Sequence, residues 1–152
     1  MTSPSARLRE LGLSLPSVAA PAGSYVPARR SGALVFTAGQ LPFVDGTLAA
    51  TGKVGAEVSP EQGNDLARTC TLNALAAVDA LVGLDAVAGV VKVVGFVASA
   101  PGFSGQPGVI NGASELLADV FGEAGRHARS AVGVAELPLG APVEVELVVE
   151  LA

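Results

Sequence analysis

Residues 128–150 read ARSAVGVAELPLGAPVEVELVVE, a stretch that predicts two strands and a turn. The segments 129–135 and 143–150 are rich in Val, and the second alternates Val with Glu. Such Val-rich, alternating segments are typical of strands. Between them, the Leu-Pro-Leu-Gly of residues 137–140 is typical of a turn. We therefore expect two strands here, joined by that turn.

Helix signals lie upstream of this stretch. Ser59-Pro60-Glu61-Gln62 carries a capping-box pattern, which predicts a long helix that runs to about Val82. A second helix is expected over residues 108–121, with its apolar residues at helical spacing. Ser3-Pro4 predicts a short N-terminal helix that ends at Gly12.

The remaining segments complete an α+β pattern. Residues 25–29 and 33–38 predict a hairpin, and the Val-rich residues 90–98 predict a mostly buried strand. This order favours one α+β domain with two helices on one face of a mixed sheet. We expect the domain to span residues 22–152, preceded by an arm with a short helix over residues 1–21.

The composition excludes several classes of protein. Half of the 152 residues are hydrophobic and 15% are charged, which excludes intrinsic disorder. Aromatic residues make up 4%, so the core must be built from small apolar side chains, and the chain is expected to complete its burial by forming an oligomer. The net charge is −5 and no run of Lys or Arg occurs, so nucleic acid is an unlikely partner.

Cysteine and histidine are too few for several kinds of chemistry. With one Cys and one His, a single chain can form neither a disulfide framework nor a Cys/His metal cluster, so we expect no metal. No glycine-rich phosphate loop occurs either, and we expect no cofactor. The N-terminus lacks a signal-peptide pattern, and the apolar residues 74–98 are interrupted by charges and glycines. We expect a cytoplasmic protein that does not bind a membrane.

Arg129 and Glu144 are the first candidates for a site. Arg129 opens its strand, and its guanidinium could bind a carboxylate in two-pronged fashion, or it could be a surface side chain paired with Asp119 or Glu123. Glu144 and Glu146 share one face of the last strand and could hold a water for attack, or simply face solvent.

The expected turn bears on how these two candidates could combine. If residues 135 and 143 pair across it, Arg129 lies about five residues, or roughly 17 Å, from Glu144. One chain could hardly place both on one small substrate. A shared site would have to lie between subunits.

Four other residues have two interpretations each. Tyr25 is either a half-buried aromatic or a hydroxyl donor at a pocket rim, and Asn111 is most simply a helix cap. His127 is interpreted as a loop residue because no acid is fixed beside it. Cys70 falls on the apolar helix face, which indicates an inert buried thiol.

Two stretches resemble a known family. Residues 32–42 (GALVFTAGQLP) resemble its strand of apolar residues followed by Ser-Gly-Gln-Ile-Pro. Residues 128–138 followed by Val-Glu-Val-Glu at 143–146 resemble its C-terminal signature. The chain is similar to the reactive intermediate deaminase family (RidA/YjgF, also labelled L-PSP endoribonuclease-like), over roughly residues 22–152, with a longer N-terminal arm than the shortest members.

The resemblance implies a chorismate-mutase-like fold and a homotrimer with clefts between subunits. It implies hydrolysis of enamines and imines, such as 2-aminoacrylate and its 2-iminopropanoate tautomer, to 2-oxo acids and ammonia. Arg129 would grip the substrate carboxylate and Glu144 would place the water. Tyr25 and Asn111 match pocket residues, and backbone groups at Gly39 and Ala131 would line the pocket.

Two departures from the family pattern affect this expectation. The family's Ser before Gly-Gln is Ala38 here, and its frequent Cys two residues after the arginine is Ala131. These changes point to a bulkier or less polar substrate, or to a low deaminase rate. The alternatives are a non-catalytic trimer that binds small carboxylates as a sensor or partner module, and, less favoured, an endoribonuclease.

Overall fold

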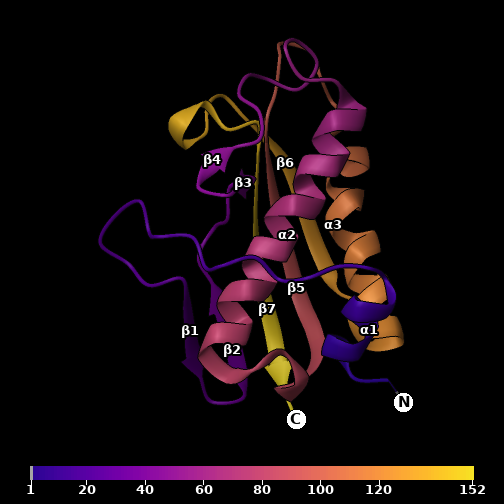
Figure 1. Ribbon diagram of the computed structural model, residues 1–152. Coiled ribbons are helices and arrows are strands. Elements are labelled where there is room, and N and C mark those ends of the chain that lie inside the picture. Colours follow the sequence, from indigo (N-terminus) through magenta and orange to yellow (C-terminus); the bar gives the residue numbers. More distant parts are fainter. Residues whose placement is uncertain (1) are drawn as a thin grey trace.

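A five-stranded mixed sheet carries the fold of the computed structural model, which describes residues 2–152 (Figure 1). The strand order is β1-β2-β7-β5-β6, with β5 and β6 parallel and the other neighbours antiparallel. The bounds are β1 (Ala28–Ser31), β2 (Leu34–Thr37), β5 (Val87–Ala98), β6 (Ala128–Val134) and β7 (Val143–Leu151). A separate small hairpin pairs β3 (Phe43–Val44) with β4 (Thr47–Leu48).

Two long helices cover one face of this sheet (Figure 1). The helix α2 (Pro60–Val82) begins with the expected capping box, in which Ser59 and Gln62 bond each other's backbone N–H. The second helix, α3 (Gln106–Phe121), packs so closely on α2 that a Cβ at Gly112 would collide with the Asn64 carbonyl. The expected architecture, two helices on one face of a mixed sheet, is confirmed.

The core lies between the helices and the sheet. It is made of Val, Leu, Ile and Ala side chains, as the low aromatic content predicts, and Cys70 is fully buried among them. Alternate residues of β5 and β7 enter it, including Val93, Val97, Val143, Val145 and Leu147. The other residues of these strands therefore point to the opposite face of the sheet.

The expected pairing of the last two strands is wrong. β6 does not form a hairpin with β7, because β5 lies between them and pairs with both. The turn region, a short 3-10 helix η3 (Pro138–Gly140), carries the chain over the end of β5 instead. In this register Arg129 is opposite Val93, and Glu144 is opposite Phe96. The expected hairpin of β1 and β2 is present.

The opposite face of the sheet is covered by no helix of residues 2–152 (Figure 1). This open face carries apolar side chains in its centre, and Phe36 and Val132 are both 44% exposed. The strand registers assign it residues that include Arg29, Ser31, Leu34, Phe36, Lys92, Val94, Phe96, Ala128, Ser130, Val132, Glu144, Glu146, Val148 and Glu150. Such a face is typical of a surface that another protein covers.

The N-terminal segment is tied to the helical layer. The helix α1 (Pro4–Glu10) is capped by Ser3, and its Leu8 is buried in the core. The hydroxyl and backbone N–H of Ser5 bond Asp85, which lowers the pKa of that carboxyl. The following arm crosses the outer side of α2 before it reaches β1 (Figure 1). Among residues 2–152, no helix has the length and apolar character that crossing a bilayer requires.

Candidate active site

Arg129 is held by neutral partners on α3. Its Nη1 donates to Asn111 Oδ1 at 2.8 Å and to Ser114 Oγ at 3.2 Å, and its Nη2 donates to the Pro107 carbonyl at 3.3 Å. The expected alternative, a pairing with Asp119 or Glu123, does not occur. A guanidinium has five N–H donors, so one at Nε and one at Nη2 remain free for a ligand. The charge of Arg129 is therefore oriented but not neutralised.

The sequence suggested that Asn111 caps a helix, but this interpretation is wrong. Asn111 lies in the second turn of α3. It acts as an acceptor for Arg129. Ser114, one turn further along the helix, shares this role, since residues three apart lie on one helix face. Sequence reasoning missed Ser114, and its spacing from Asn111 is the signal that could have found it.

His127 supports the same cluster from behind. Its Nδ1 lies 2.6 Å from the Gly125 carbonyl, which can only accept, so Nδ1 carries the proton. Its Nε2 lies 2.9 Å from Ser114 Oγ. In the neutral ring, Nε2 accepts the hydroxyl proton and turns the Ser114 lone pairs toward Arg129. His127 is a loop residue as expected, and it contacts Arg129 indirectly, through Ser114.

Glu144 lies on the opposite face of the sheet from Arg129, beside Gly39. It is half-buried, and no donor of residues 2–152 bonds its carboxylate. Burial raises the pKa of Glu144, and the nearby charge of Glu146 raises it further. A Cβ at Gly39 would lie 2.5 Å from Glu144 Oε1, so any other residue here would displace this carboxylate from its present position. A carboxylate in such a setting can hold a water and accept its proton.

Tyr25 and Ala38 belong to the Glu144 side. A small groove there is lined by the arm and by the segment after β2, and includes Tyr25 and Gly39. The hydroxyl of Tyr25 accepts a bond from the backbone N–H of Ala22, and the side chain is 49% exposed. Ala38 precedes Gly39, and its N–H donates to the Pro27 carbonyl.

The structure thus divides the expected site residues into two groups. Arg129, Asn111 and Ala131 lie at β6 and α3, and Ala131 packs against the core on the same face as Arg129. Glu144, Gly39, Ala38 and Tyr25 lie at β7 and the segments before and after β1 and β2. Arg129 and Glu144 are two strands apart across the sheet and three residues apart along it, which places their backbones about 14 Å from each other. Their side chains point to opposite faces of the sheet.

Other side chains offer less chemistry. Burial raises the pKa of the Cys70 thiol far above its ordinary value, which agrees with an inert thiol. Within the described residues 2–152, no three His, Cys, Asp or Glu side chains gather closely enough to hold a metal ion.

Comparison with known proteins identifies the family. Residues 5–151 match the model of the family described as "YjgF/chorismate_mutase-like, putative endoribonuclease". The chain belongs to the YjgF/RidA family. It therefore has the chorismate-mutase-like fold of that family.

Individual relatives agree with this assignment. The chain is 48% identical over 148 residues to Protein TCP17 of Trypanosoma cruzi, covering 96% of this chain and 92% of that protein. The structure of Atu1372 from Agrobacterium tumefaciens, a protein described as of unknown function, is 46% identical with a TM-score of 0.90, covering 98% and 92% of the two chains. The structure of Escherichia coli TdcF with bound serine is 26% identical with a TM-score of 0.66, covering 91% and 96%.

Proposed function

We propose that this protein is an enamine/imine deaminase that hydrolyses 2-imino acids, such as 2-iminopropanoate, to 2-oxo acids and ammonia. The observation that carries the proposal is Arg129, whose charge is oriented by three neutral acceptors and still has two free donors. A carboxylate accepts two parallel N–H bonds from such a group. The serine held by the related TdcF also bears a carboxylate.

The chemistry needs little beyond positioning. The carboxylate of the substrate binds Arg129, and Glu144 holds a water against the imine carbon. The water oxygen bonds to that carbon while Glu144 takes a proton from the water. Glu144 passes that proton to the nitrogen, which gives a carbinolamine. The remaining hydroxyl proton then moves to the same nitrogen, the carbon–nitrogen bond breaks as the carbonyl forms, and ammonia leaves with the 2-oxo acid as the second product. Imines already hydrolyse in water, so orientation of the reactants supplies the acceleration, and no metal or organic cofactor enters this reaction.

A site between subunits reconciles this chemistry with the 14 Å separation. We propose a homotrimer in which Arg129 of one protomer meets Glu144 of the next. The open face supports this arrangement, because its exposed Phe36 and Val132 offer an apolar surface for a second copy. Tyr25, Gly39 and the Ala38 backbone would complete the Glu144 side, and Asn111 and Ala131 the Arg129 side.

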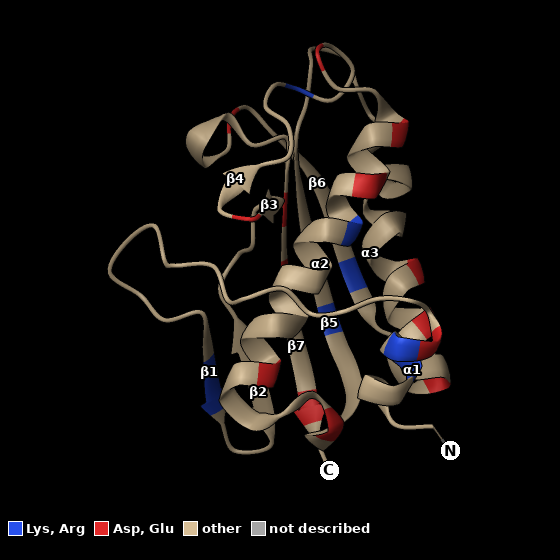
Figure 2. Ribbon diagram, viewed as in Figure 1, with Lys and Arg blue, Asp and Glu red and all other residues tan. Residues whose placement is uncertain are grey.

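The endoribonuclease name attached to the family receives no support from the charge distribution. Lys and Arg residues are scattered over β1, α1, β5 and β6 and form no stripe (Figure 2). With a net charge of −5, the chain offers little attraction for a phosphate backbone.

A coupled assay tests the proposal. An amino-acid oxidase generates imines from alanine to leucine, and formation of the 2-oxo acid is followed with and without the protein. We expect acceleration that falls by about 100-fold or more in Arg129→Ala, because a charge-assisted pair is lost. If the folded protein does not accelerate the reaction, the proposed deaminase activity is wrong. The second candidate function, a module that binds small carboxylates, would then remain, and the apolar Ala38 and Ala131 favour it.

A further inference from the structure

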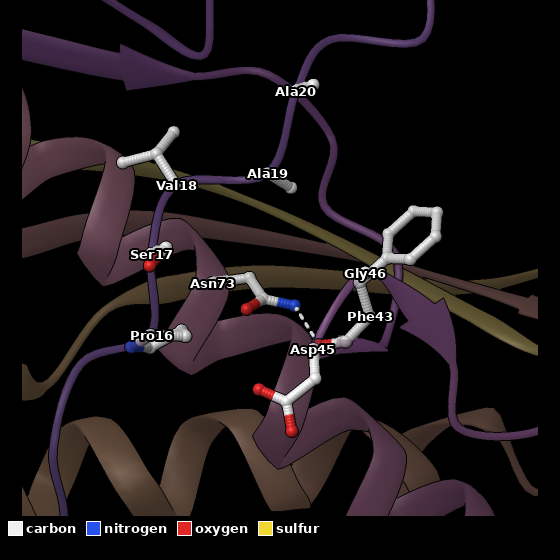
Figure 3. Close-up of a pocket in the computed structure, with 9 residues that line it drawn as sticks. All are labelled: Pro16, Ser17, Val18, Ala19, Ala20, Phe43, Asp45, Gly46 and Asn73. Atoms are coloured by element: carbon white, nitrogen blue, oxygen red, sulfur yellow. Dashed lines mark hydrogen bonds between the residues drawn. The ribbon is translucent and has the colours of Figure 1, made fainter.

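A cavity of about 480 Å³ lies between the N-terminal arm, the β3–β4 hairpin and α2 (Figure 3). Its walls are mostly apolar, with Val18, Ala19 and Phe43 among them. The volume is in the range of cavities that hold small organic ligands. It far exceeds what the methyl group of 2-iminopropanoate would fill.

Asn73 presents an unused oxygen to this cavity. The side chain is 4% exposed, and its Nδ2 donates to the carbonyls of Leu41 at 3.0 Å and Phe43 at 3.1 Å. Both amide protons are thereby used, and Oδ1 points away from the hydrogen bond to Phe43 (Figure 3). No donor of residues 2–152 bonds this oxygen, so a ligand that enters the cavity must supply one.

Asp45 adds a negative charge at the same cavity. With Gly46 it forms the two-residue turn of the hairpin, and both have positive φ, 51° and 80°. The ion pairs of residues 2–152 lie elsewhere, so no Lys or Arg neutralises Asp45. Among the polar side chains that line the cavity, Asp45 and Asn73 Oδ1 only accept, and the Ser17 hydroxyl can accept as well as donate, so the cavity favours a ligand end that carries N–H groups and positive charge.

The cavity borders the small groove that lies beside Gly39. It shares Ala19, Ala20 and Phe43 with the groove that includes Tyr25 and Gly39. Gly39 in turn lies against Glu144. A molecule whose reacting carbon lies near Glu144 would reach the cavity by passing Gly39 and then following the arm.

We infer that this cavity is the subsite for the substrate side chain, and that it favours a 2-imino acid with a long aliphatic side chain ending in a cationic N–H donor, such as a guanidinium. This inference rests on the proposed deaminase function. The methylene groups would pack on Val18, Ala19 and Phe43, while the cationic end meets Asp45 and Asn73 Oδ1. The arm that roofs the cavity thereby becomes a determinant of specificity.

Direct binding of two 2-oxo acids tests the subsite without turnover. The probes are 2-oxo-5-guanidinopentanoate and 2-oxohexanoate, which share the carboxylate and an aliphatic stem and differ in the cationic end. Calorimetric titration of the full chain should give a Kd about five- to tenfold lower for the guanidino acid, as expected for hydrogen bonds to a charged group. Equal affinities would overturn the inference.

The variant Asp45→Asn tests whether the negative charge of Asp45 causes the preference for the guanidino acid. Asn tolerates the left-handed backbone at this turn, so the hairpin should fold unchanged. We expect this variant to lose the preference for the guanidino acid, whereas Asp119→Asn, the same change on the exposed side of α3, should keep it. A preference that survives in Asp45→Asn would contradict the assignment.

The assay separates this inference from the proposed function. Turnover of alanine- and norleucine-derived imines without preference for the arginine-derived imine would overturn only the subsite. A binding preference that depends on Asp45, with no turnover of any imine, would overturn the deaminase and leave the subsite as a binding site for guanidino acids.

Discussion

Arg129 and Glu144 lie on opposite faces of the same sheet, with β5 between their strands. Arg129 points to the helical face, where α3 holds it, and Glu144 points to the open face beside Gly39. Under the proposed shared site, each protomer would contribute Arg129 to one site and Glu144 to another.

Mixing two inactive variants tests the shared site. The variants Arg129→Ala and Glu144→Gln are unfolded together in equal amounts and refolded. About three quarters of the random trimers then contain both variants, and each of these has one intact site out of three. We therefore expect about a quarter of wild-type activity. Each variant refolded alone is the control. Hybrid trimers without activity would show that the two residues do not meet across an interface.

The open face should hold the trimer together. Val132→Asp places a charge at an exposed apolar position of this face, on the edge strand β6. We expect it to shift the mass in light scattering from about 45 kDa, three times the 15.0 kDa chain, toward the monomer, with loss of activity. Leu139→Asp, at an exposed apolar residue of η3, is the comparison and should leave the mass unchanged. A trimer that persists in Val132→Asp would place the interface elsewhere.

Ser114 should act on substrate binding through Arg129. Ser114→Ala removes one of three acceptors of the guanidinium, so we expect KM to rise about three- to tenfold with kcat little changed. His127→Ala should produce a smaller change of the same kind, because it orients Ser114, and His127→Asn should recover part of the loss. A fall in kcat at unchanged KM would contradict a role in positioning.

Gly39→Ala should impair the water-holding carboxylate. A methyl group at residue 39 meets Glu144, so the carboxylate must move. We expect kcat to fall at least tenfold, toward the activity of Glu144→Gln, while Gly32→Ala in the β1–β2 turn keeps its activity. Wild-type kcat in Gly39→Ala would exclude Glu144 from the reaction.

Glu144→Gln should stabilise the protein at neutral pH. The folded chain raises the pKa of Glu144, so the folded state binds the proton more tightly than the unfolded one. Stability from this group is therefore present at low pH and is lost as the pH rises from about 4.5 through the raised pKa. The variant should melt roughly one or two degrees higher at pH 7.5, with no difference near pH 4. Glu150→Gln on the same strand is the control, and a lower melting temperature in Glu144→Gln would contradict the account.

Local signals in the sequence determined the helices and most strands. The capping box at Ser59, the helical spacing of apolar residues in α2 and α3, and the alternation of Val and Glu in β7 act over a few residues, so they can be interpreted from the chain alone. The motif around Arg129 and the Val-Glu-Val-Glu of residues 143–146 also indicated the family.

Tertiary structure decided which strands are neighbours and what each site residue faces. The turn at Pro138 suggested a hairpin, but β5 occupies the place beside β7 because its buried Val93 and Val97 pack under the helices, and β6 is left at the edge. Ser114, His127 and the cavity at Asn73 likewise depend on segments that are distant in sequence. Pairing and cavity formation follow from packing of the whole domain, and no local pattern encodes them.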